Sequence, residues 1–140
     1  CLEHNPYWRE TVANMLRMSR ADGLVLISCA TIGRKEHGTT RTNPDASPFT
    51  VEARWDYYRN LTAADIERGA HLAGWLSDWR FWTHYISRDL YFIGLRQGGA
   101  AQLDRAMVDA LDRRYAMSAN AKALRRGLKS KLIGDLLSGG

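Results

Sequence analysis

The sequence predicts an α/β fold in which helices pack on a β-sheet, followed by a helical C-terminal extension. Three observations predict this fold. Residues 6–19 carry apolar side chains at helical spacing, and a nearly continuous apolar run follows at residues 24–30. Residues 79–86 and 90–96 are rich in aromatic residues and have the pattern of a β-hairpin. Residues 100–137 carry two further helical stripes, so we divide the chain into an α/β domain at 1–98 and an extension at 99–140.

The first helix and the first strand follow from local signals. Asn5 suits the N-cap and Pro6 suits the first helical position. Gly23 permits a sharp turn into the strand. The strand at 24–30 shows no alternation, which is typical of a strand covered on both faces in a parallel sheet. The apolar stripe of the helix comprises Trp8, Val12, Met15, Leu16 and Ser19.

The middle of the chain combines a long loop with a short helix. Residues 31–55 are rich in Gly, Pro, Thr and Arg, and we expect an extended loop, which in a compact domain is usually functional or disordered. Thr62 and Asp65 have the spacing of a capping box, so we expect a helix over 63–69. A turn anchored by Trp75 should follow at 72–76.

The hairpin has two distinct faces, and the tail has two helices. Alternation places one set of side chains (Trp79, Phe81, Thr83 and Tyr85) on one face of the hairpin and the other set (Arg80, Trp82, His84 and Ile86) on the opposite face.

The first tail helix has an apolar stripe of Leu103, Ala106, Met107, Ala110 and Leu111. The second has Leu124, Leu128, Leu132 and Leu136, with Lys and Arg on its other faces. A solvated basic face is the simpler interpretation of that helix, and an anionic membrane surface or a partner is the alternative.

Composition narrows the function classes. The chain has 140 residues, a size that suits one domain. Its formal net charge of +5 affects solubility first, and binding to nucleic acid is only the second interpretation of that charge. We therefore do not expect nucleic acid as the partner. The two cysteines suggest no disulfide framework and favour a cytoplasmic location. We find no apolar run long enough for a membrane span and no signal peptide.

The order of these elements resembles the second half of a class I S-adenosylmethionine-dependent methyltransferase. Residues 1–4 resemble the end of its fourth strand and the Leu-Glu-His turn, and residues 24–30 resemble its fifth strand. Residues 79–86 and 90–96 resemble its sixth and seventh strands, so the resemblance implies a partial Rossmann-like sheet in the order 5-7-6. The segments 2–8, 29–31, 37–39 and 56–61 together resemble a subgroup found beside sugar and polysaccharide biosynthesis functions. The turn at 20–23 keeps only the last glycine of the family's pattern.

The resemblance also implies site residues. Cys1, Leu2 and Glu3 would border the methionine part of the cofactor. His4, at the edge of the sheet, is a candidate base, and His37 is a candidate for facing the acceptor. Simpler roles are that Glu3 and His4 fix the start of the helix and that His37 lies in a solvated loop. A second pair, Tyr57 and Tyr58, would line a small-molecule or saccharide acceptor pocket or pack the loop. We expect His84 to be a surface residue or a partly satisfied core residue.

The family's cofactor motifs are missing from this sequence. It contains no glycine-rich turn after a first strand and no acidic residue after a second. We therefore expect a C-terminal fragment that does not bind S-adenosylmethionine tightly on its own. The alternative is a free-standing, non-catalytic protein that self-associates through the edge of strand 24–30, since a bare apolar edge pairs readily with another chain. A third and weaker alternative is an RNA- or membrane-binding module that uses the basic tail.

Other kinds of site have no signal in the sequence. The four histidines and two cysteines show no C-x-x-C or H-x-x-x-H spacing, so we expect no metal site. No G-x-S-x-G motif marks a nucleophilic serine.

Overall fold

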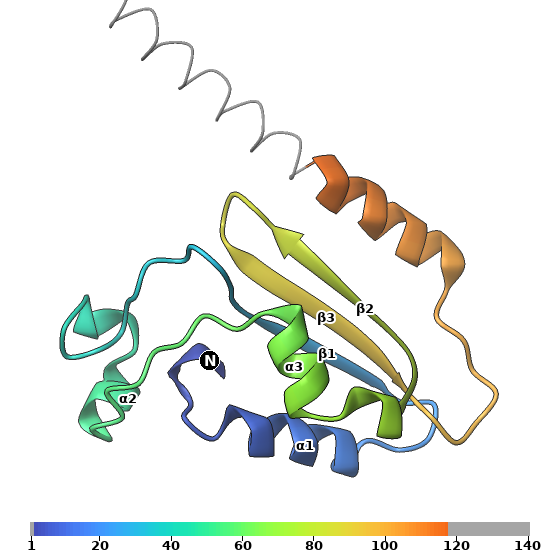
Figure 1. Cartoon of the computed structure of the whole chain (residues 1–140), viewed down its shortest axis with the longest axis horizontal. Coiled ribbons are helices and arrows are strands. Elements are labelled where there is room, and N and C mark those ends of the chain that lie inside the picture. Colours follow the sequence, from blue (N-terminus) through green and yellow to red (C-terminus); the bar gives the residue numbers. More distant parts are fainter. Residues whose placement is uncertain (1, 118–140) are drawn as a thin grey trace, which may run out of the picture.

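The structure is a computed structural model that describes residues 2–117. Its described part is a mixed α/β fold with one three-stranded sheet and a helix at residues 105–117 after the last strand (Figure 1). Cys1 and the predicted second tail helix lie outside the described residues. The elements in chain order are η1 (Leu2–His4), α1 (Trp8–Met18), β1 (Leu24–Ala30), η2 (Pro44–Ala46), α2 (Pro48–Glu52), α3 (Ala63–Gly69), η3 (Leu72–Gly74), β2 (Leu76–His84) and β3 (Asp89–Arg96).

The sheet has the strand order β1-β3-β2, and both pairings are antiparallel. The predicted hairpin is confirmed, although its first strand begins at Leu76 rather than at residue 79. The parallel sheet expected around residues 24–30 is wrong for the described strands. The expected cover on both faces of β1 is also wrong, because Leu24 and Leu26 are 55% and 66% exposed while Val25 and Ile27 are buried.

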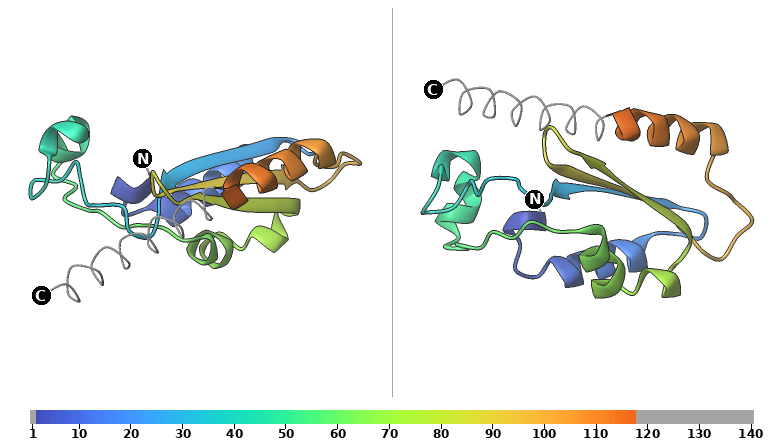
Figure 2. Two further views of the ribbon diagram at one scale, coloured as in Figure 1. Left: turned by 90° about the horizontal axis from the view of Figure 1, so that it is seen from above. Right: turned by 45° about the horizontal axis from the view of Figure 1, so that its top comes forward.

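Helices cover the two faces of the sheet unequally (Figure 2). On one face, α1 and α3 pack against the inward side chains of all three strands, and this is the larger core. On the other face, Val108 of helix 105–117 and Leu103, which precedes that helix, pack against Trp82, Ile93 and Leu95. The predicted split of the hairpin into two faces is confirmed, since Trp79 and Phe81 contact the first core and Trp82 belongs to the second.

The predicted stripe of α1 is confirmed, but its start is not. Trp8, Val12 and Leu16 are buried, while Tyr7 rather than Asn5 occupies the N-cap and Pro6 precedes the helix. The Asn5 side chain still accepts a hydrogen bond of 2.8 Å from the Tyr7 backbone N–H. The amide thus holds the turn that leads into the helix instead of capping it.

The segment after β1 is more structured than its composition predicts. Residues 31–55, expected as an extended loop, contain the short helices η2 and α2, and Pro44 and Pro48 start them. The fixed φ of proline suits a first helical position, which explains why proline-rich sequence forms helix here. The helix at 63–69 is confirmed, with reciprocal capping-box bonds between Thr62 and Asp65. The turn at 72–76 contains the short helix η3.

The tail helix faces the sheet with a different stripe from the one predicted. Leu103 and Val108 are buried and Leu111 and Tyr115 are half-buried, whereas the predicted Ala106, Met107 and Ala110 are exposed. The two exposed alanines offer little apolar area to bury, whereas Leu103, Leu111 and Tyr115 offer more. Among residues 2–117, no helix is both long and apolar enough to cross a membrane.

Candidate functional site

The candidate site lies beyond the carboxyl end of β1, where η1 meets the segment of residues 31–60 (Figure 1). Three hydrogen bonds fix this meeting point. Arg59 N–H donates to the Glu3 carbonyl at 2.8 Å, and Leu61 N–H donates to the Ala30 carbonyl at 3.0 Å. The Asn60 amide donates to the Arg34 carbonyl at 2.9 Å. The segment therefore leaves β1 and returns to it, carrying its middle part past η1.

A polar network holds the outer part of this segment. The Arg41 guanidinium contacts the carboxylates of Glu36 at 2.9 Å and Asp56 at 2.6 Å. Thr40 donates to Asp56 from both its backbone N–H and its hydroxyl. All of these groups are solvent-accessible, so each contact is weak, but together they join residues that are 20 positions apart.

Gly38 brings the segment against η1. Its φ of +62° lies in the left-handed region. A Cβ atom at this position would lie 2.5 Å from the Ser47 Cβ and 3.0 Å from the His4 Cε1. Glycine is the residue that meets both demands at once, since it tolerates positive φ and has no Cβ.

Three rings meet at this approach. His4, His37 and Tyr58 lie with each pair of ring centroids 5.2 Å apart and each pair in an edge-on arrangement. The Lys35 carbonyl orients two of them, because the Tyr58 hydroxyl donates to it at 3.1 Å and His37 Nδ1 lies 3.0 Å from it. The two histidines, 33 positions apart in sequence, are thus brought together as candidate site residues.

Burial sets the charge state of these groups. His4 is 7% exposed, and its Nδ1 is buried without a hydrogen-bond partner. Burial lowers the pKa of His4, and the neighbouring Glu3 carboxylate opposes the shift without reversing it. The ring is therefore neutral at pH 7, with a nitrogen lone pair available. Burial, aided by the Glu3 charge, raises the pKa of Tyr58 to about 12, so its hydroxyl stays protonated and acts as a donor.

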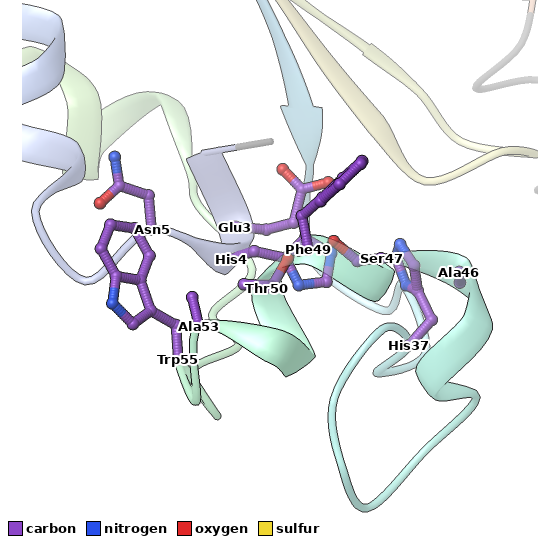
Figure 3. A pocket seen from close by; sticks show the side chains of 10 residues that line it. All are labelled: Glu3, His4, Asn5, His37, Ala46, Ser47, Phe49, Thr50, Ala53 and Trp55. Atoms are coloured by element: carbon purple, nitrogen blue, oxygen red, sulfur yellow. Dashed lines mark hydrogen bonds between the residues drawn. The ribbon is translucent and has the colours of Figure 1, made fainter.

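A pocket of about 530 Å³ opens beside the histidines (Figure 3). Glu3 and His4 of η1 and His37 of the loop contribute to its wall, and α2 contributes Phe49 and Thr50. Phe49 is 83% exposed. The pocket therefore combines a polar wall with an apolar edge, which suits a small ligand that carries both kinds of surface.

The pocket wall also contains a group of potential metal ligands. Glu3, His4 and His37 each offer one ligand atom, and these three atoms all lie within 4.8 Å of one another. Sequence spacing could not have predicted this group, since the contact depends on how residues 31–60 return to η1.

The other predicted site residues are placed differently. Leu2, expected beside the cofactor, is buried in the larger core, and Cys1 lies outside the described residues. Tyr57 and Tyr58 are half-buried and are not among the residues that line the pocket. His84 bonds Ser87 Oγ at 2.6 Å in the hairpin turn, a structural contact. Four further residues that line the pocket were not predicted, because no sequence motif marks them: Ser47, Phe49, Thr50 and Trp55.

No family model matches this chain, and neither the curated proteins nor the solved structures gave a significant match to it. The site must therefore be interpreted from its own chemistry.

Proposed function

We propose that this chain is the C-terminal part of a class I S-adenosylmethionine-dependent methyltransferase and that it supplies the acceptor side of the active site. The observation that carries the proposal is the pairing of His4 with His37 on the wall of a pocket beyond the carboxyl end of β1. In α/β proteins, ligands bind at the carboxyl ends of the strands. The resemblance selects these two histidines as the catalytic candidates.

The arrangement of the strands supports the proposal. The middle strand β3 is antiparallel to both β1 and β2. The resemblance expects this relationship for strands five, seven and six. A three-stranded antiparallel sheet is also common outside this family, so the strand arrangement supports the fold and only indirectly the activity.

The acceptor we propose is a small molecule such as a saccharide. The polar wall of Glu3, His4 and His37 suits hydroxyl groups, and the exposed ring of Phe49 suits an apolar ring face. The cofactor would supply an electrophilic methyl group, and the pocket's task is to hold the acceptor oxygen or nitrogen in line with it.

The chain's own residues do not fit the cofactor. Residues 2–117 contain no glycine-rich turn between a strand and a helix, and the Leu2 side chain is used in the core. The Glu3 carbonyl is used by the Arg59 N–H. We therefore assign no cofactor site to these residues and expect calorimetric titration of the 140-residue chain with S-adenosylmethionine to show no micromolar binding. Binding at micromolar affinity would contradict this part of the proposal.

The coding DNA upstream of Cys1 gives the first test of the activity. An in-frame strand, glycine-rich turn and helix there would support the methyltransferase, and an unrelated sequence would contradict it. In the completed protein, His37→Ala should lower transfer of a radiolabelled methyl group by roughly 100-fold. His71→Ala, at an exposed position outside the pocket, is the matched control and should leave transfer unchanged.

A second candidate function is that of a non-catalytic protein that self-associates through β1. It is favoured by the position of β1 at an edge of the sheet and by the exposure of Leu24 and Leu26. An apolar edge strand offers unpaired backbone groups to a second copy of the chain. Light scattering at tens of micromolar separates the candidates, since a clean monomer contradicts this one.

A further inference from the structure

We infer that Glu3, His4 and His37 form a binding site for a divalent transition-metal ion. The three residues come from two segments that are separated by more than 30 positions in the chain, and the structure places them together on one wall of the pocket (Figure 3). The inference rests on the distances among their ligand atoms, on an unpartnered nitrogen of His4 and on the orientation of the His37 ring.

The distances allow one ion to reach all three residues. Three atoms that are no more than 4.8 Å apart share a point within about 2.8 Å of each, which is 4.8 Å divided by √3. Metal–nitrogen and metal–oxygen bonds are about 2.0–2.2 Å long. Each ligand atom therefore needs to move by less than about 1 Å, which is within the reach of small side-chain rotations.

His4 provides an independent reason to place an ion here. Its side chain is more than nine-tenths buried, and its Nδ1 has no hydrogen-bond partner. A buried polar atom without a partner is costly, and each such atom in a folded protein needs an explanation. A metal ion bound to this nitrogen would supply the missing partner.

The surroundings of His37 are those of a metal-binding histidine. When His37 Nδ1 carries the proton, it donates to the Lys35 carbonyl at 3.0 Å. This tautomer leaves the lone pair on Nε2, which is the nitrogen left for an ion. Ligating histidines usually donate their second ring N–H to a carbonyl or carboxylate, which fixes the ring and raises its basicity.

The ligand set indicates which ions would bind. Two imidazoles and one carboxylate favour Mn²⁺, Fe²⁺, Co²⁺, Ni²⁺ or Zn²⁺ over Mg²⁺ and Ca²⁺, which prefer oxygen ligands. Three protein ligands leave coordination positions open toward the pocket, where oxygen atoms of water or of an acceptor could enter. Use of those positions by a methyl acceptor rests on the proposed function, whereas binding of the ion does not.

Cobalt(II) is the probe that tests the site, because its visible absorption reports the ligands. The 140-residue chain is titrated with Co²⁺ in a non-coordinating buffer, and absorption and heat are recorded together. We expect one equivalent to bind with a spectrum typical of nitrogen and oxygen ligands. His37→Ala should weaken binding by more than roughly tenfold, and Glu3→Gln and His4→Gln should do the same.

His71→Ala is the matched control, since His71 is exposed and lies outside the group. Circular dichroism checks that each variant is folded. If His4→Gln unfolds, His37→Ala still decides, because His37 lies on the loop and not in the core. Absence of one-equivalent binding by the unmodified chain, or equal affinity in His37→Ala and His71→Ala, would overturn the inference. Metal binding without methyl transfer in the completed protein would keep the site and reject the proposed function.

Discussion

The core between the sheet and α1 and the loop of residues 31–60 are held together by different interactions. In the core, buried aliphatic and aromatic side chains from α1, α3 and the three strands contact one another. In the loop, hydrogen bonds and exposed ion pairs connect residues such as Arg41, Asp56 and Asn60. Burial of apolar area contributes about 1.5–3 kcal/mol for each large side chain, whereas exposed ion pairs contribute little.

This difference explains why the candidate site lies where the two regions meet. The core fixes η1, because Leu2 is part of it, and so it fixes the neighbouring Glu3 and His4. The loop supplies His37 from a frame of hydrogen bonds and exposed ion pairs. The site therefore combines one wall attached to the core with one wall on a surface loop, where binding residues commonly lie.

The largest effect should come from breaking the core. Leu16, in the last turn of α1, is 0% exposed, so Leu16→Ala removes buried methyl groups and leaves a cavity. We expect the free energy of unfolding, measured by urea denaturation, to fall by about 3 kcal/mol.

Met18→Ala is the matched control on the same helix. Met18 is 71% exposed, and its truncation should change the free energy of unfolding by less than about 0.5 kcal/mol. Equal losses in the two variants would mean that α1 does not pack as the structure describes. Cobalt affinity of the folded fraction should be the same in both.

Gly38→Ala should lower the free energy of unfolding less than Leu16→Ala does, but it should weaken cobalt binding more. The new Cβ would meet Ser47 and His4 at a φ of +62°, which stores roughly 1–3 kcal/mol of strain unless the loop shifts. A shift of the loop moves His37 away from His4. We therefore expect cobalt binding to weaken by at least about tenfold while the urea midpoint falls less than in Leu16→Ala.

Gly74→Ala provides the control for adding a methyl group. A Cβ at Gly74 meets nothing within 4 Å, and its φ is outside the strained range. This substitution should leave cobalt affinity unchanged. If Gly38→Ala also leaves it unchanged, the close approach of the loop to η1 is not what positions His37.

The sequence was informative where structure is set by near neighbours in the chain. The capping box of Thr62 and Asp65 depends on a spacing of three residues, and the hairpin depends on alternation between adjacent strands, so both could be predicted. The apolar run at 24–30 predicted a strand correctly, but the prediction that both faces of this strand are covered is wrong. An apolar run indicates that its side chains are suited to burial, but it does not indicate which neighbouring element covers them. In the fold, no element buries Leu24 or Leu26, and both remain exposed.

The candidate site could be predicted only in part. His4 and His37 were selected through the resemblance, but their contact depends on the path of about 30 intervening residues. It also depends on the loop that carries His37, which turns at Gly33 and Gly38. Hydrogen bonds from Arg59 and Asn60 tie the later part of that loop back. No local pattern encodes these long-range hydrogen bonds. The sequence therefore carries no metal-ligand spacing, although Glu3, His4 and His37 come together in the fold.

The smallest of the three effects concerns Asp65, which links the two regions. Its carboxylate accepts from the Thr62 backbone N–H of the capping box at 3.0 Å and from Arg59 of the loop at 2.8 Å. Burial alone would raise the pKa of Asp65, but the hydrogen bonds from Thr62 and the charge of Arg59 outweigh it, so the pKa is lowered. A carboxyl whose pKa is lower in the folded state stabilises the fold above its unfolded pKa, and this contribution is lost as pH falls through the folded pKa. We expect Asp65→Asn to cost about 1 kcal/mol at pH 7.

The pH dependence of that cost identifies its origin. The difference in unfolding free energy between the unmodified chain and Asp65→Asn should shrink steadily as pH is lowered from 5 toward about 2, because the carboxyl of the unmodified chain becomes protonated. Asp109→Asn, at an exposed position on helix 105–117, is the matched control and should change the free energy of unfolding at pH 7 by less than about 0.5 kcal/mol. If the loss of unfolding free energy in Asp65→Asn stays constant down to the lowest pH, it comes from hydrogen-bond geometry or packing and not from the negative charge of Asp65. In that case Asp65 would cap α3 without binding the loop to the core through its charge.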